Sequence, residues 1–190
     1  PEGMTTMEGA LVEPAAVGMH AAVLGGAQPG KSIVILGGGT IGLMVLQACI
    51  SLGGTDITVV GVIEKRLELA KKLGAARVIN GKEEDTVAVL RSEEMYGDHG
   101  VDLVFEAAGA VFTAQQAVQI VSRGGKIMMV GTQSKPVPID FLKINREVTI
   151  QTSFRYCNNY PQTIEAIRSG KFNVKDMVTH VYDYKVFVNK

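Results

Sequence analysis

A short apolar run that leads directly into a glycine-rich turn limits the folds open to this chain more than any other feature. Residues 32–36 read Ser-Ile-Val-Ile-Leu, a composition typical of a buried strand. Residues 41–52 have the apolar composition of a packed helix, and a glycine pair at 53–54 ends it. The turn between them, residues 37–42, reads Gly-Gly-Gly-Thr-Ile-Gly. Strand, glycine turn and helix in this order favour a parallel α/β sheet with a phosphate site at the turn.

The three glycines at GxGxxG spacing each have a physical reason to be glycine. Gly37 permits the tight turn, Gly39 lets a pyrophosphate approach the backbone, and Gly42 lets the helix pack close to the sheet. The free N–H groups of the first helical turn, at Thr40 and Ile41, then face the phosphates. The alternative is an ordinary glycine-rich turn of a flavodoxin-like or regulatory fold.

The rest of the chain repeats the alternation of short β-branched runs with segments of helical period, which is typical of a sheet wound with helices. The predicted further strands are 57–60, 77–79, 101–105, 126–130 and 148–152. The predicted further helices are 64–73, 83–91, 111–121 and 161–169, and residues 177–190 are less clearly patterned. We therefore predict a Rossmann fold: a doubly wound parallel six-stranded sheet in the order 3-2-1-4-5-6, with helices on both faces.

Charge and cysteine content narrow the class of ligand. The 19 basic and 19 acidic residues cancel, so we expect neither nucleic acid nor a membrane surface as partner, and a small molecule instead. Cys49 and Cys157 lack CxxC spacing, which argues against a disulfide framework or a zinc ribbon and favours the cytoplasm. Glycines interrupt the most apolar stretch, residues 32–50, so we predict no membrane span.

Two further strand ends support a dinucleotide site. The fourth strand leads into Glu-Ala-Ala-Gly at 106–109, and the fifth leads into Gly131 and Thr132. Ligands of open α/β sheets bind at the carboxyl ends of the strands, and small residues there leave room for the ribose and the nicotinamide.

The residue at the end of the second strand indicates whether the adenosine ribose of the cofactor carries a 2′-phosphate. A carboxylate there would bind the ribose hydroxyls of NAD, but the position is Gly61. Without the acid, about 1.5–3 kcal/mol is lost for each such hydrogen bond, and a 2′-phosphate meets no repulsion. Lys65 and Arg66 could pair with that phosphate, while Glu64 could swing back to a ribose. The cofactor is therefore NAD or NADP, with a slight preference for NADP.

Several separated stretches resemble the zinc-containing medium-chain alcohol dehydrogenases. Residues 13–21, Glu-Pro-Ala-Ala-Val-Gly-Met-His-Ala, are similar to a helix of that family. Residues 154–161, Phe-Arg-Tyr-Cys-Asn-Asn-Tyr-Pro, with Val-Thr-His at 178–180, resemble its sorbitol (L-iditol 2-) dehydrogenase branch. The chain starts at a proline and stops within an apolar pattern, so we expect a piece of a longer protein.

The resemblance implies a division of labour between domains. Residues 1–30 would join from an N-terminal catalytic domain that is missing here and supplies the zinc ligands, 31–170 would bind the dinucleotide, and 171–190 would return towards the catalytic domain. The reaction implied is reversible transfer of hydride between a sugar alcohol and NAD(P), with zinc present in the full-length enzyme. We expect no catalytic residue within this fragment, which would be inactive alone.

The resemblance also assigns roles to individual residues. Glu13 would be a neighbour of the zinc or of its water, while Arg155 and Tyr156 would contact the substrate. The structural alternative for Glu13 is a carboxylate that stabilises the start of a helix. The alternative for Arg155 and Tyr156 is a place in an exposed loop. The expected cofactor contacts are Gly37, Gly39, Thr40, Ile41, Gly42, Gly61, Arg66, Gly131, Thr132, Phe154 and Arg155. We expect His20 to be packed or close to the cofactor and not to bind metal.

Other functions remain open at this point. The chain could belong to a threonine or general alcohol dehydrogenase branch, it could be a non-catalytic dinucleotide sensor, or it could be a methyltransferase. Glu13 and the pair Arg155-Tyr156 would have no purpose in a sensor, and Gly61 weakens the methyltransferase reading. An apolar late strand at the sheet edge favours pairing with a second copy, so we expect a homodimer or homotetramer.

Overall fold

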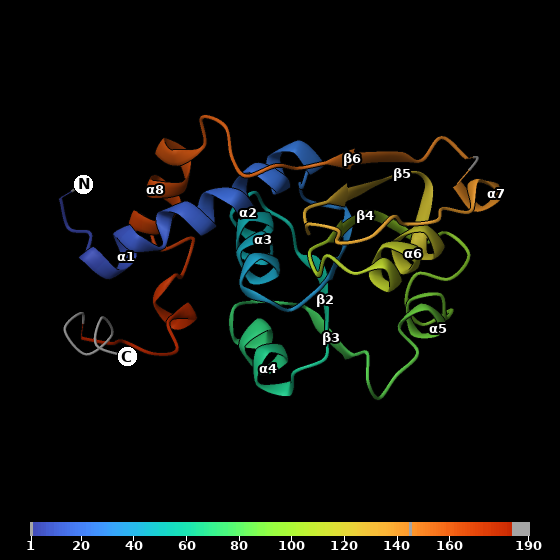
Figure 1. Cartoon of the computed structure of the whole chain (residues 1–190), viewed down its shortest axis with the longest axis horizontal. Helices are drawn as coiled ribbons and strands as arrows, with labels where there is room; N and C mark the ends of the chain where they lie inside the picture. Colours follow the sequence, from blue (N-terminus) through green and yellow to red (C-terminus); the bar gives the residue numbers. More distant parts are fainter. Residues whose placement is uncertain (1, 145, 184–190) are drawn as a thin grey trace.

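The computed structural model describes residues 2–144 and 146–183, and within them one six-stranded sheet has the order β3-β2-β1-β4-β5-β6 (Figure 1). Every neighbouring pair of strands is parallel, so the predicted fold class and strand order are confirmed. The strands are β1 (Ser32–Leu36), β2 (Asp56–Gly61), β3 (Arg77–Asn80), β4 (Val101–Glu106), β5 (Val121–Met129) and β6 (Thr149–Thr152).

Helices cover both faces of the sheet, with α2, α3 and α4 on one side and α5 and α6 on the other (Figure 1). The helices are α1 (Thr6–Ala10), α2 (Val12–Gly25), α3 (Thr40–Ser51), α4 (Glu64–Lys72), α5 (Thr86–Leu90), α6 (Val111–Ile120), α7 (Phe141–Ile144), α8 (Tyr160–Arg168) and the 3-10 helix η1 (Lys175–Met177).

Strand β1 shows why the sheet is buried on both faces. Ile33 and Ile35 belong to the core under α2 and α3, while Val34 and Leu36 belong to the core under α5 and α6, and all four are fully buried. Burying each such side chain contributes about 1.5–3 kcal/mol. An unbroken apolar run is therefore what a central parallel strand requires.

Two elements differ from the prediction by more than two residues in length. The helix expected at 83–91 is only α5, because the Asp85 carboxylate accepts hydrogen bonds from the amides of Val87 (3.0 Å) and Ala88 (3.1 Å) and so caps a later start. The strand expected at 126–130 begins at Val121 and contains a register shift against β4. Residues 178–183 form no strand, and the rest of the loosely patterned tail, 184–190, lies outside the described residues.

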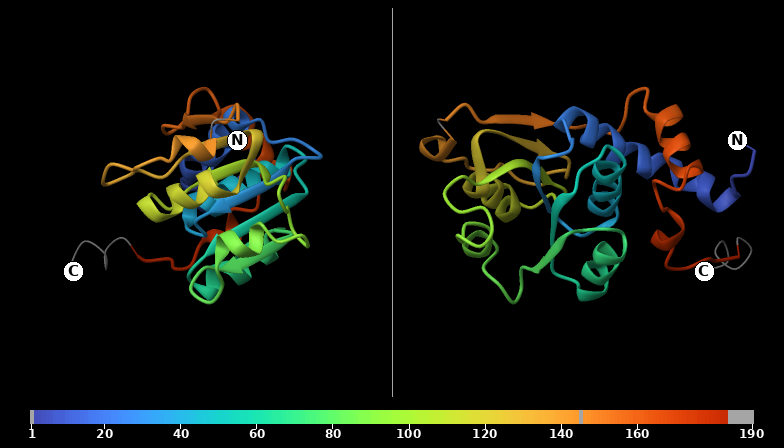
Figure 2. Two further views of the ribbon diagram at one scale, coloured as in Figure 1. Left: turned by 90° about the vertical axis from the view of Figure 1, so that its right-hand side faces the viewer. Right: turned by 180° about the vertical axis from the view of Figure 1, so that it is seen from behind.

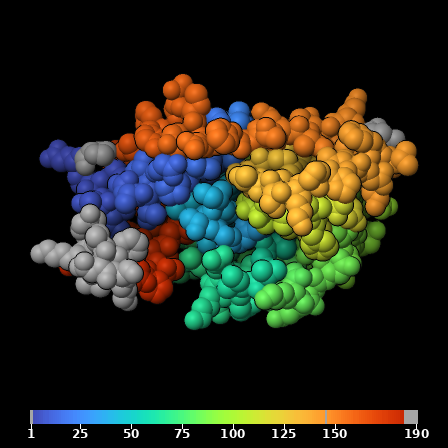
Figure 3. All heavy atoms as spheres, in the orientation of Figure 1, coloured from blue at the N-terminus to red at the C-terminus, as the bar shows by residue number. Residues whose placement is uncertain are grey.

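The first helix and the segment with η1 lie at the same end of the molecule (Figure 2). Lys175 forms an ion pair with Glu8 there, with Nζ and Oε1 3.3 Å apart. In the space-filling view, the orange segment with β6 and the loop after it runs along the upper rim (Figure 3). Strand β6 is the last strand of the sheet order and is largely exposed. No helix within 2–144 or 146–183 is long and apolar enough to cross a membrane.

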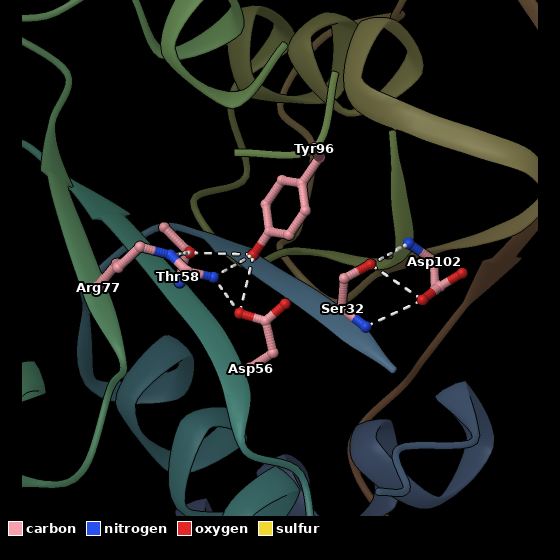
Figure 4. Close-up of polar contacts among 6 residues, drawn as sticks. All are labelled: Ser32, Asp56, Thr58, Arg77, Tyr96 and Asp102. Carbon is pink, nitrogen blue, oxygen red and sulfur yellow. Dashed lines mark hydrogen bonds and ion pairs between the residues drawn. The ribbon is translucent and has the colours of Figure 1, made fainter. Parts of the chain in front are cut away.

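Polar side chains close the amino edge of the sheet, where the strands begin (Figure 4). Arg77 at the start of β3 pairs with Asp56 at the start of β2 and donates to the Tyr96 hydroxyl at 2.9 Å. Burial raises the pKa of Tyr96. Asp102 of β4 accepts from both the amide and the hydroxyl of Ser32, each at 2.9 Å. These bonds outweigh the effect of burial and lower the pKa of Asp102.

Candidate functional site

The glycine turn between β1 and α3 has the geometry that its sequence predicts. Gly37 has a φ of 121°, in the region that side chains avoid, and its amide donates to the carbonyl of Val60 at 2.9 Å. A Cβ on Gly42 would overlap the carbonyl oxygen of Gly37, so only glycine lets α3 start here. No side chain caps α3 at Gly39, which leaves the first amides of the helix free for a ligand.

A cavity of about 310 Å³ opens beside this turn. Four of the predicted cofactor residues line it, namely Gly37, Gly39, Gly61 and Arg66, and the first turn of α3 with Thr40, Ile41 and Gly42 follows directly. The other lining residues are Gly38, Val60, Val62, Ile63, Gly81, Thr86, Ala107, Ala108, Phe112, Thr113 and Gln116. Arg66 is the charged residue of this lining, which contains no carboxylate.

Glu64 and Arg66 are placed differently with respect to the part of the cavity at the end of β2. The Glu64 carboxylate accepts from the side-chain amide of Asn80 at 3.1 Å and is absent from the lining. Nη1 of Arg66 lies 4.0 Å from the position that a Cβ on Gly39 would take. Arg66 has no side-chain hydrogen bond or ion pair with any described residue, so its guanidinium is available to a ligand beside the turn.

The loops after β4 and β5 touch each other. A Cβ on Gly109, which has a φ of 68°, would lie 2.7 Å from the carbonyl oxygen of Thr132. A Cβ on Gly131 would overlap the amide of Gly109. The small residues predicted to leave room for the nicotinamide are thus also required by this close approach of two backbones. Neither Gly131 nor Thr132 lines the cavity.

Glu106, at the end of β4, is a site residue that sequence reasoning named only as part of a strand end. Its carboxylate is fully buried. One oxygen accepts from the amides of Ala108 (3.0 Å) and Gly109 (2.9 Å) and from the Thr113 hydroxyl (2.7 Å), and the other accepts from Gln133 (2.8 Å). An acid directly after an apolar strand was the available signal, but its partners are set by the tertiary fold.

A second cluster lies away from the glycine turn, where the loop after β6 meets α2. The rings of Tyr156 and Tyr160 are 4.9 Å apart. A hydrogen bond with Tyr156 and burial raise the pKa of Tyr160 to about 12, and the charges of Tyr156 and Glu13 add to this effect. Tyr160 of α8, which sequence reasoning did not single out, thus contacts Tyr156 of the loop, and the charge of Glu13 of α2 acts on it.

The same loop presents its remaining predicted residues to the outside. Phe154 is 80% exposed, and the Arg155 guanidinium lies 5.3 Å from the centre of its ring. Arg155 and Asn158 have φ values of 53° and 55°, which side chains adopt only when the surroundings hold them. The loop is joined to α2, because Oδ1 of the buried Asn159 hydrogen-bonds Nδ1 of His20 at 2.9 Å.

Within 2–144 and 146–183, no group of three or more His, Cys, Asp or Glu side chains is arranged to hold a metal ion. Cys49 is buried in the core, and burial raises the pKa of its thiol. The described residues therefore do not fit a zinc ion, and no chemical step through zinc is assigned to them.

Comparison with known proteins agrees with this geometry. Residues 40–169 match the family described as Zinc-binding dehydrogenase. The uncharacterized zinc-type alcohol dehydrogenase-like protein YdjJ of Escherichia coli (strain K12) is 63% identical over 185 residues, which are 97% of this chain and 53% of the relative. Sorbitol dehydrogenase of Bacillus subtilis (strain 168) is 40% identical over 185 residues, 96% of this chain and 52% of the relative.

A solved structure extends the comparison. A Sinorhizobium meliloti 1021 protein assigned as a zinc-binding dehydrogenase, with NADP bound, has a TM-score of 0.89 at 26% identity, covering 94% of this chain and 53% of that one. The chain spans about half the length of these relatives. The predicted resemblance is confirmed: this chain belongs to the zinc-binding dehydrogenase family and contains its cofactor-binding half.

Proposed function

We propose that this chain is the dinucleotide-holding half of a zinc-dependent dehydrogenase that transfers hydride between a polyol and NADP. The cavity beside the glycine turn carries the proposal, because its lining combines free helix amides with one unpaired guanidinium and no carboxylate. Such a lining suits a dinucleotide with three phosphates better than one with two.

The preference for NADP rests on the end of β2. NAD is usually held there by a carboxylate, and neither Gly61 nor the displaced Glu64 offers one to the cavity. Arg66 supplies a planar guanidinium that can donate two parallel hydrogen bonds to a phosphate. The relative with NADP bound is consistent with this choice.

The proposed roles divide between the two clusters. When bound, the dinucleotide would supply the hydride acceptor at its nicotinamide ring. Gly37, Gly39 and the start of α3 would hold its phosphates, and the loops after β4, β5 and β6, with Thr132, Phe154 and Arg155, would orient its nicotinamide end.

Glu13, Arg155 and Tyr156 would face the polyol. The supporting observations are the contact of Tyr156 with Tyr160 of α8 and the effect of the Glu13 charge on Tyr160, and Arg155 lies next to Tyr156 in the same loop. The zinc ligands would come from a part of the enzyme outside this chain, so we expect the chain alone to bind the dinucleotide without oxidising polyols. The exposed edge strand β6 would pair with a second copy in a homodimer or homotetramer.

Calorimetric titration with NADP and NAD tests the cofactor assignment. We expect the wild-type chain to prefer NADP. Arg66→Gln should lower NADP affinity about tenfold to a hundredfold and change NAD affinity little, because it removes hydrogen bonds to one phosphate. Lys65→Gln is the matched control, since Lys65 is adjacent and absent from the lining. Equal affinities for both cofactors, unchanged by Arg66→Gln, would reject the NADP preference.

Gly61→Asp tests the preference for NADP over NAD by adding the carboxylate that an NAD site usually has. A Cβ at this position would lie 3.0 Å from Cδ2 of Leu67, the end of a side chain that can move by a few tenths of an ångström. The new carboxylate should raise NAD affinity and lower NADP affinity. An unchanged ratio in a folded variant would mean that the ribose does not lie at the end of β2.

A further inference from the structure

Glu106 is a buried ionisable group that the proposed binding roles leave unused. Its four hydrogen-bond partners are two backbone amides, the Thr113 hydroxyl and the Gln133 side-chain amide, all at 2.7–3.0 Å. The two backbone amides and the Gln133 amide group can only donate. The Thr113 hydroxyl lies 2.9 Å from the carbonyl oxygen of Ala110 as well, and it can donate to the carboxylate, so the ionised form satisfies every partner. Within the described residues, no Lys, Arg or His pairs with Glu106. The site therefore contains a buried negative charge that is stabilised by hydrogen bonds and not by a cation.

This charge lies where the strand-end loops meet. Gly109 and Ala108 belong to the loop after β4, and Gln133 belongs to the loop after β5. Thr113, on the first turn of α6, lines the cofactor cavity. One carboxylate thus fixes both loops and the wall of the cavity, and its field extends into the carboxyl edge of the sheet where a nicotinamide would lie.

We propose that the charge of Glu106 shifts the relative affinity of this site towards the oxidised dinucleotide. The inference rests on the proposed function. The oxidised and reduced forms share the same adenosine and phosphates, and they differ by the positive charge of the oxidised nicotinamide ring. A fixed buried anion stabilises that positive charge and gives nothing comparable to the neutral reduced ring. The group acts through charge and position, so we class it as a positioning residue.

Glu106→Gln removes the charge while the contacts can be kept. Its amide oxygen can accept from the three donors around Ala108, Gly109 and Thr113. Oε1 of Gln133 is buried and has no hydrogen-bond partner, so a rotation of the Gln133 amide would let it accept from the new side-chain amide. The variant therefore changes the charge of the site more than its shape.

Calorimetric titration of the chain with NADP and with NADPH measures the effect. We expect Glu106→Gln to lower the ratio of NADP affinity to NADPH affinity by about tenfold. Asp102→Asn is the matched control, because it removes a hydrogen-bonded carboxylate at the opposite edge of the sheet, and it should leave this ratio unchanged. A purely structural role for Glu106 would make Glu106→Gln weaken both affinities together and leave their ratio unchanged.

A second variant keeps the test decisive if Glu106→Gln does not fold. Gln133→Lys places an ammonium group beside the carboxylate and should also lower the ratio of NADP affinity to NADPH affinity. An unchanged ratio in the folded charge variants overturns the inference and leaves the proposed function standing. Failure of the wild-type chain to bind either form overturns both.

Discussion

The two edges of one sheet are built in opposite ways. At the amino edge, Asp56, Arg77, Tyr96 and the Ser32–Asp102 pair close the strands with side-chain hydrogen bonds (Figure 4). At the carboxyl edge, glycines bring backbone against backbone and leave a cavity lined by one charged side chain. The same sheet therefore has side-chain hydrogen bonds at one edge and a cavity at the other.

This difference predicts which substitutions change cofactor affinity and which change only stability. A side chain added at the carboxyl edge collides with main chain, which cannot move aside cheaply. A side chain changed at the amino edge loses hydrogen bonds that are far from the cavity. We therefore expect substitutions at the carboxyl edge to change cofactor affinity, and substitutions at the amino edge to change stability alone. Three substitutions test this expectation.

Gly42→Ala should have the largest effect, because its Cβ overlaps the Gly37 carbonyl oxygen. We expect a loss of about 3 kcal/mol in unfolding free energy and a loss of NADP binding of at least about a hundredfold. Urea unfolding and calorimetry measure the two quantities. Gly9→Ala is the control, since a Cβ there meets nothing within 4 Å and should leave affinity unchanged. Wild-type affinity in Gly42→Ala would disprove the backbone account of the carboxyl edge.

Asp102→Asn should cost about 1.5–3 kcal/mol at neutral pH, because Ser32 then donates to an uncharged group, and NADP affinity should stay constant. The pKa of Asp102 is lowered in the folded state, so the carboxylate stabilises fully above its ordinary pKa of 3.8 and loses this contribution as pH falls through the folded value. Urea midpoints measured from pH 7 downwards should converge for wild type and variant in acid. A constant gap down to pH 2 would contradict this assignment.

Tyr96→Phe should have the smallest effect, about 1 kcal/mol in unfolding free energy. The phenol loses its bond from Arg77 at 2.9 Å, while the ring keeps its position 5.6 Å from the Arg77 guanidinium. The Arg77–Asp56 ion pair also remains. Thermal unfolding gives the stability change. Any clear change in NADP affinity would show that the two edges are coupled.

Local sequence patterns predicted most of the fold because its central strands are continuous apolar runs between glycines. The strand at 32–36 and the turn after it could be identified from composition and spacing, and both have the expected structure. The start of α5 was misplaced because Asp85 caps it three residues later than expected. The early start of β5 includes Gly124 and Gly125, which read locally as a turn.

Some features of the candidate site could be predicted from nearby residues in the sequence, and others depend on contacts between distant segments. The glycine turn, Gly61 and Arg66 are neighbours in the cavity because strand and helix spacing places them there. The partners of Glu106 and the pairing of Tyr156 with Tyr160 depend on where separate loops meet, and no periodicity encodes that. The role of Glu13 and Arg155 was suggested by family resemblance and stays a prediction.

The hydrogen bond between His20 and Asn159 has a mechanical consequence. It ties α2 to the loop after β6, and α8 packs on α2 directly behind that loop. Glu13 and Tyr156 therefore lie on elements that are bonded to each other, although they are far apart in the chain. A displacement of α2 would be transmitted through this bond to the loop that contains Tyr156.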